Sequence, residues 1–135
     1  MSPERIKELL ASFSDALSRL KESLQEDSTR SSTIIDGTIQ RFEFTFELAW
    51  KLLRLILLNE GVESNTPRAV LKEAYRAKLI TEGDGWIDML EDRNKTSHLD
   101  DEKISAAIYR KIKESHFQRL NDLRQTAEKV VRLQP

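Results

Sequence analysis

Apolar side chains recur at intervals of three and four residues along most of the chain, which is the spacing of one face of an α-helix. The first such segment opens with Ser2 as an N-cap and Pro3 at the first helical position. A polar run at 25–33 then interrupts the pattern. The spacing therefore predicts a first helix whose apolar face carries Ile6, Leu9, Leu10, Phe13, Leu17, Leu20 and Leu24.

A longer second helix is expected over about 33–60, with Gly61 as its C-terminal stop. Within it, residues 42–50 (FEFTFELAW) alternate apolar and polar side chains and could be mistaken for a strand. No turn signal separates this window from its flanks, and the whole segment exceeds the usual length of a strand. One helix therefore accounts for the series Ile39, Phe42, Phe46, Ala49, Leu53 and Ile56.

Three more helices follow. Thr66 and Pro67 repeat the cap-then-proline signature of a helix start, with an apolar side formed by Val70, Leu71, Ala74, Leu79 and Ile80. After a turn at 81–86, a short fourth helix carries Trp86, Ile87, Met89 and Leu90. The last begins after the acids at 100–102 and runs to about Leu133. Long helices with short connections predict a single all-α domain over 1–135, an antiparallel up-and-down bundle of four long helices and one short one.

The composition excludes several classes of function. The chain of 135 residues has no cysteine, which excludes thiol chemistry and cysteine-ligated zinc, and its two histidines lie far apart. No P-loop, G-x-G-x-x-G or acidic metal triad is present, and no metal or cofactor is expected. The start has no apolar h-region and no apolar run approaches the roughly 18 residues of a membrane span, so we expect a cytoplasmic protein without membrane contact.

The net charge of −1 argues against a basic nucleic-acid coat, but the charge is unevenly spread. Residues 82–102 hold eight acids and two bases, whereas 103–132 hold eight bases and three acids. This asymmetry can guide a partner or a second subunit, or can simply mark two solvated faces.

The stretch EDRNKTSHLD at 91–100 holds the best candidate chemistry. Arg93 and His98 are five positions apart and would point about 140° away from each other in a regular helix. They can share a site only if the helix ends or bends between them, as the short hydroxyl residues at 96–97 favour. Histidine exchanges protons near neutral pH and arginine binds phosphate oxygens, so the pair suits a phosphodiester. The alternative is a helix-capping arginine and a loop histidine.

Further polar and aromatic residues have two interpretations. Glu47 lies one helical turn before Lys51, so the two form either a solvent-side ion pair or part of a polar stripe entering a cleft that binds substrate. His116 lies in a basic stretch and is interpreted as a surface residue. Trp50 and Trp86 are expected in the core rather than as stacking platforms.

Two of these stretches together resemble a known family. The segments IQRFEFTFELAWK at 39–51 and RNKTSH at 93–98 are similar to signatures of the HEPN superfamily, and more narrowly of its HepT-like branch, the nucleotidyltransferase substrate-binding proteins. The resemblance spans essentially the whole chain. It implies a helical bundle that forms a homodimer or higher homo-oligomer and pairs with a small nucleotidyltransferase encoded nearby, in a toxin–antitoxin type of module.

The resemblance also implies residue roles. In the HepT-like branch the helical protein is a metal-independent ribonuclease, and its nucleotidyltransferase silences it by attaching AMP to a tyrosine. Arg93 would then stabilise the scissile phosphate, His98 would be the general acid or base, and Asn94 would help order the site. Asp100 stands where the branch commonly has that tyrosine, and the nearest one downstream is Tyr109. AMP attachment would therefore use another residue, or regulation differs here.

Three functions remain open at this level. The first is a non-catalytic partner, or substrate-binding subunit, of a nucleotidyltransferase, with RNA or a nucleotide as a further candidate ligand. The second is a ribonuclease that uses Arg93 and His98 at a homodimer cleft. The third is a purely structural helical dimer.

Overall fold

The computed structural model describes residues 3–95 and 101–133, and every regular element in these ranges is helical. The expected all-α bundle is therefore confirmed for this part of the chain. The elements are α1 (Pro3–Leu24), α2 (Ser32–Asn59), α3 (Pro67–Arg76), α4 (Gly83–Asn94), α5 (Glu102–Lys111), the π-helical turn η2 (Ile112–His116) and α6 (Phe117–Arg132). None of these helices is long and apolar enough to cross a membrane.

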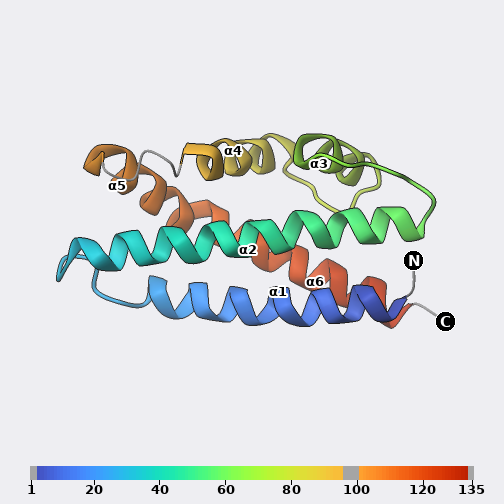
Figure 1. Ribbon diagram of the computed structural model, residues 1–135, viewed down its shortest axis with the longest axis horizontal. Coiled ribbons are helices and arrows are strands. Elements are labelled where there is room, and N and C mark those ends of the chain that lie inside the picture. Colours follow the sequence, from blue (N-terminus) through green and yellow to red (C-terminus); the bar gives the residue numbers. More distant parts are fainter. Residues whose placement is uncertain (1–2, 96–100, 134–135) are drawn as a thin grey trace.

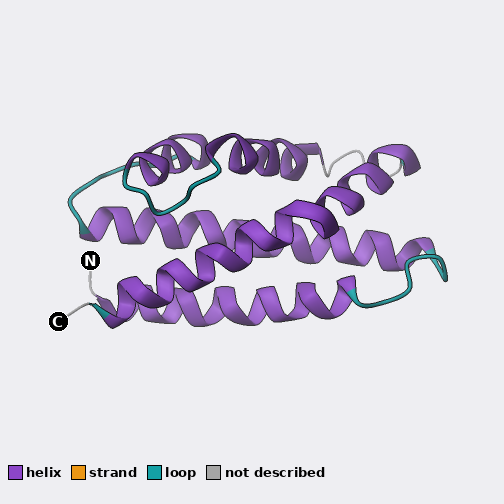
Figure 2. Ribbon diagram, turned by 180° about the vertical axis from the view of Figure 1, so that it is seen from behind, coloured by secondary structure: helices purple, strands orange, loops and turns teal. Residues whose placement is uncertain are grey.

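The long helix α2 is the centre of the arrangement. Figure 1 shows α1 running antiparallel along one side of α2, and α3 and α4 lying along the other. The C-terminal segment α5–η2–α6 is one continuous helix that starts beside α4 and crosses diagonally to end beside α1 (Figure 2). This crossing joins the two sides of the molecule and places the C-terminal segment against both α4 and α1.

The helix starts follow the sequence signals. Ser31 caps α2 by accepting from the backbone N–H of Thr33, and Thr66 caps α3 by accepting from that of Ala69. Asp101 caps α5, where its carboxylate accepts from two backbone N–H groups. The last helix begins one residue earlier than predicted, at Glu102 within the acidic run, and the acids lie at its N-terminus as expected.

Helix α3 is shorter than expected, ten residues rather than a long helix reaching Ile80. It ends because Lys78 adopts a left-handed conformation, with φ of 63°. The N–H of Lys78 bonds the carbonyl of Tyr75 and the N–H of Leu79 bonds that of Ala74, which is the Schellman pattern of a helix end. Leu79 and Ile80 remain buried, but they belong to the connection after the helix.

The core runs the length of α2 and collects apolar residues from every other helix. Phe13, Phe42, Phe46, Leu53 and Met89 are fully buried. Trp86 is buried as predicted, whereas Trp50 is half-buried and packs against the edge of the core. The apolar series that predicted α1 and α2 therefore point inward, and α2 gives both sides of the molecule a common core.

Candidate functional site

The last turn of α4 brings together residues that are far apart in the sequence. Arg93 donates through Nη2 to the Oε2 of Glu47 on α2, and through Nη1 to the Oδ1 of Asn94 at 3.3 Å. Lys51 lies one turn further along α2, with its Nζ 3.9 Å from the Oε1 of Glu47. The side chains of Arg93 and Glu47 are each about one-third exposed, so solvent reaches the pair.

The structure thus joins four predicted site residues, Arg93, Asn94, Glu47 and Lys51, at one place. Of the two interpretations of Glu47, the simple ion pair with Lys51 is incomplete, because Glu47 also holds Arg93. Helix α4 ends at Asn94, so a helix does end between positions 93 and 98. His98 and Asp100 lie outside the described residues.

Immediately before Arg93, the side chain of Asp92 is buried and makes charged contacts. It is 1 % exposed, and its Oδ2 lies 2.7 Å from the Nε2 of His116 and 2.8 Å from the Nζ of Lys111. Lys111 also donates to the Oδ1 of Asp88 at 2.9 Å. A buried carboxylate is costly unless it is paired, and here two donors from the C-terminal segment pair it.

The interpretation of His116 as a surface residue is wrong. Its side chain is fully buried in η2, and its ring stacks on Phe42 of α2 with centroids 5.5 Å apart. The missed signal is the series Ile108, Ile112, His116 and Leu120, spaced by four, which places His116 on the apolar face of the last helix. The surrounding lysines and arginines concealed it because they occupy the other faces.

The hydrogen bonds around His116 assign its tautomer. Arg119 donates through Nη1 to Nδ1 at 2.9 Å, and a guanidinium can only donate, so Nδ1 accepts. The ring proton therefore sits on Nε2 and points to the carboxylate of Asp92. Arg119 also donates through Nε to the Oε1 of Glu82 at 3.2 Å, which ties it to the start of α4.

The charges of this network shift two pKa values. Burial by itself would raise the pKa of Asp92, but hydrogen bonds from His116 and Lys111 and the positive charge of Lys111 outweigh it and hold the pKa below its usual value. Burial would likewise lower the pKa of Lys111, but Asp92 and Asp88 raise it above its usual value. Both groups are therefore charged over the whole neutral range.

Asp88, Asp92 and His116 are the described residues whose geometry could hold a metal ion, since their ligand atoms lie within 4.8 Å of one another. The ammonium group of Lys111 already contacts both carboxylates, and Nε2 of His116 directs its proton at Asp92. The cluster is thus a network in which a lysine takes the position that a cation would occupy between the two carboxylates.

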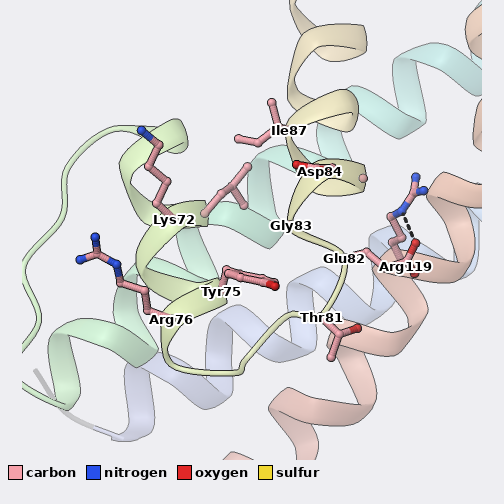
Figure 3. A pocket seen from close by; sticks show the side chains of 11 residues that line it. Lys72, Tyr75, Arg76, Thr81, Glu82, Gly83, Asp84, Ile87 and Arg119 are labelled. Carbon is pink, nitrogen blue, oxygen red and sulfur yellow. Dashed lines mark hydrogen bonds and ion pairs between the residues drawn. The ribbon is translucent and has the colours of Figure 1, made fainter.

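A cavity of about 770 Å³ lies at the opposite end of α4 from Arg93, between α3, the start of α4 and α6. Figure 3 shows Tyr75 of α3 lying against Gly83, and Arg119 reaching from α6 to Glu82. Of the two tyrosines in the chain, Tyr75 is the exposed one, while Tyr109 is buried with its hydroxyl unpaired within the described residues. Tyr109 is therefore not accessible for modification in this conformation.

The chain is similar in sequence to a known protein. A probable ribonuclease HepT from Haemophilus influenzae is 34% identical over 85 residues, which span 59% of this chain and 58% of that protein. The alignment thus covers less than two thirds of that relative's own length.

Two solved structures, among others, share the fold. One, of a protein from Thermus thermophilus, is 34% identical, covers 91% of this chain and 99% of its own, and superposes with a TM-score of 0.71. The other, HI0074 of Haemophilus influenzae, is described as the fold of a substrate-binding domain of a nucleotidyltransferase. It is 23% identical, covers 94% of this chain and 99% of its own, and has a TM-score of 0.66, which supports the fold alone.

The family assignment rests on most of the chain rather than on one motif. Residues 8–129, from α1 through α6, match the family described as nucleotidyltransferase substrate binding protein like. This range contains both segments that carried the resemblance in the sequence, 39–51 and 93–98. The chain belongs to the nucleotidyltransferase substrate-binding protein-like family.

Proposed function

We propose that this chain is the helical partner, or substrate-binding subunit, of a small nucleotidyltransferase, and that the two are encoded together as a toxin–antitoxin type of module. The observation that carries the proposal is the family match over 8–129. The description of HI0074 as a nucleotidyltransferase's substrate-binding domain agrees with it. The absence of a nucleotidyltransferase motif in this sequence fits a division of labour between two chains.

A surface on α1 and α2 supports the proposal. Phe44 is 61% exposed and lies beside Arg19 and Arg41 at a shallow depression of about 440 Å³. Aromatic residues and arginine are the residue types that are enriched in protein–protein interfaces and that supply most of their binding energy. Helix α2 packs against α1, α3, α4, α5 and α6, and Phe44 remains exposed among these contacts.

The test is to purify the tagged chain from its native host and to identify what accompanies it. The proposal predicts a stoichiometric small protein with a nucleotidyltransferase motif, encoded in the adjacent reading frame. Recovery of the chain without any nucleotidyltransferase, under low salt and at native expression, would contradict the proposal.

The second candidate function is a metal-independent ribonuclease acting at a homodimer cleft. Arg93 favours it, because Glu47 and Asn94 hold its guanidinium at the end of α4 while leaving it accessible to solvent. Glu47, Arg93 and Lys51 together carry one net positive charge, which suits a phosphate group. The relative named as a probable ribonuclease HepT adds weight to this candidate.

In this candidate mechanism a ribose 2′-hydroxyl attacks the adjacent phosphorus and the 5′-oxygen of the next nucleotide leaves. His98 would take the proton from the 2′-oxygen or give one to the leaving oxygen. Arg93 would donate to the non-bridging oxygens as charge builds on the five-coordinate phosphorus. The products would be a 2′,3′-cyclic phosphate and a 5′-hydroxyl, and no metal is needed for the proton transfers.

Cleavage of RNA in the presence of a chelator tests this candidate. The variants Arg93→Ala and His98→Ala are each expected to abolish cleavage while the helical circular dichroism is retained. The matched control is Arg68→Ala, which removes an arginine at the start of α3, away from the site. Equal cleavage by all three variants would assign the activity to a contaminant or to another site.

A further inference from the structure

The last turn of α4 is held from two directions by consecutive side chains. Asp92 reaches into the core and is held by His116 of η2, while Arg93 reaches toward α2 and is held by Glu47. We infer that His116 is a positioning residue: through its bond to Asp92 it fixes the rotation of this turn and thereby the direction of Arg93. The inference rests on the role proposed for Arg93 in RNA binding and cleavage.

Burial decides what kind of role His116 can have. His116 is fully buried and Asp92 is 1 % exposed, so neither side chain can touch an RNA phosphate. Their effect on a site must pass through Arg93, the residue that follows Asp92 in the chain. The side chains of consecutive helical residues point about 100° apart. Holding the side chain of Asp92 in one direction therefore fixes the direction in which the side chain of Arg93 leaves the helix.

His116 is itself located relative to α2. Its ring stacks on Phe42 with an angle of 15° between the two planes, and Phe42 lies on the same helix as Glu47. Glu47, which binds Arg93, and Phe42, which stacks on His116, thus belong to the same helix, α2. Lys111 forms an ion pair with Asp92, but its side chain is flexible and one-third exposed. Lys111 therefore offsets the charge of the carboxylate without fixing its direction.

Arg119 completes the arrangement by donating to the second ring nitrogen of His116. Because Arg119 donates to Nδ1, the ring proton must lie on Nε2 and face Asp92. The guanidinium can reach His116 only because residue 85 is glycine. A Cβ at Gly85 would lie 2.2 Å from the Nε of Arg119, too close for both to stay in place.

Three variants separate positioning from simple loss of stability. His116→Leu removes both ring nitrogens, and His116→Gln keeps an amide N–H near the place of Nε2. Gly85→Ala leaves the buried residues untouched but displaces Arg119 from His116, and alanine is the better helix former at this position. The matched control is Leu20→Ala, a buried apolar change in α1, which supplies no residue to the network.

The first measurement is made on isotope-labelled protein without RNA, by NMR of the Arg93 Nε–Hε group and of the two His116 ring nitrogens. The inference predicts that His116→Leu shifts or broadens the Arg93 signal, that His116→Gln largely restores it, and that Leu20→Ala leaves it in place. Gly85→Ala removes the Arg119 donor from Nδ1, so the Nδ1 signal should shift while Nε2–H stays on Asp92. The ring is then held at one nitrogen only, so the Arg93 signal should shift as well, which keeps the test decisive even where His116→Leu fails to fold. An unchanged Arg93 signal in folded His116→Leu or in Gly85→Ala would overturn the inference.

The second measurement is cleavage of RNA. We expect kcat to fall roughly 10- to 100-fold in His116→Leu, with a smaller change in KM, because a displaced arginine loses contact chiefly in the transition state. A rise in KM with an unchanged kcat would contradict positioning. The two results can also differ. If the Arg93 signal responds to substitution of His116 but neither the parent protein nor any variant cleaves RNA, the ribonuclease function is refuted and the positioning inference stands.

Discussion

Asp92 is a buried charge whose partners come from another part of the chain. Its carboxylate accepts from His116 and Lys111, both of which belong to the C-terminal segment. The contacts therefore join α4 to the helix that crosses the whole molecule. Removing one member of such a group leaves the others buried without partners, which costs more free energy than the intact group contributes.

Asp92→Ala should therefore lower the free energy of unfolding by about 3 kcal/mol, because the Nε2–H of His116 is left without an acceptor. Asp92→Asn should cost less, since its amide oxygen can still accept from His116. Urea unfolding followed by circular dichroism measures both. Glu91→Gln, a change at the exposed neighbouring position, is the control and should stay within about 0.5 kcal/mol of the parent protein.

The pH dependence of stability follows from the lowered pKa of Asp92. Its folded pKa lies below the unfolded value of about 3.9, so its contribution is present above that value and is lost as the pH falls through the folded pKa. The difference in unfolding free energy between the parent protein and Asp92→Asn should hence shrink as the pH is lowered below about 4. If the unfolding free energies of the two proteins, plotted against pH, stay parallel from about pH 6 to about pH 2, Asp92 has no lowered pKa.

The sequence predicted Arg93, Asn94, Glu47 and Lys51 as site residues, but it could not show that they meet. The ion pair between Arg93 and Glu47 joins positions 46 residues apart, and only the packing of α4 on α2 creates it. Periodicity identifies which face of a helix is buried, not which helices become neighbours.

At the scale of elements, α2 and α3 end in the same way but with different residues. Gly61 and Lys78 both adopt a left-handed conformation, and each takes part in the paired backbone hydrogen bonds of a Schellman motif. Glycine has no Cβ to strain in this conformation, whereas lysine does. The chain therefore provides a natural pair for comparison.

We expect opposite effects of substitution at these two positions. Gly61→Ala should lower the unfolding free energy by about 1 kcal/mol, because alanine is strained at a φ of 88°. Lys78→Gly should raise it by about 0.5 kcal/mol or more, since it relieves that strain. Thermal or urea unfolding of both variants measures the effect, and a loss of stability in Lys78→Gly would show that the lysine side chain makes contacts outweighing the strain.

The π-helical turn explains how a series spaced by four residues keeps His116 on the buried face. A spacing of four residues advances the buried face by about 40° at each step in a regular α-helix, so Ile108, Ile112, His116 and Leu120 would drift around the helix. The turn Ile112–His116 takes up the extra residue, and Ile112, His116 and Leu120 all remain fully buried. Sequence periodicity alone contains no signal for such a turn.

At the scale of the molecule, the all-helical bundle followed from helix caps and apolar spacing because these act locally. The length of α3 could not be predicted from these signals, because the end of this helix depends on the conformation of a single lysine, Lys78. The family followed from two segments, 39–51 and 93–98, the first on α2 and the second beginning in the last turn of α4. Oligomerisation depends on a second chain and stays a prediction.

The homodimer proposal predicts twice the chain mass of 15.7 kDa by sedimentation equilibrium at micromolar concentration. Two chains are needed because the ribonuclease candidate places two Arg93–His98 motifs in one cleft. A monomer at these concentrations would remove the composite site, while leaving the family assignment unaffected.

Phe44 is expected to contribute to association with the nucleotidyltransferase. Phe44→Ala should weaken binding at least about tenfold, because an exposed aromatic ring at the centre of a contact supplies much of its energy. Tyr75→Ala, which removes the exposed ring of α3 outside this surface, is the matched control and should bind normally. Titration calorimetry measures both, and equal affinities would place the partner elsewhere.

The central claim is that this chain is the partner of a nucleotidyltransferase, and sedimentation velocity of the two purified chains tests it most directly. The proposal predicts that a mixture with the nucleotidyltransferase encoded in the adjacent reading frame forms one faster-sedimenting complex of fixed stoichiometry at micromolar concentration. Two chains that sediment independently at these concentrations, with both proteins folded, would contradict it.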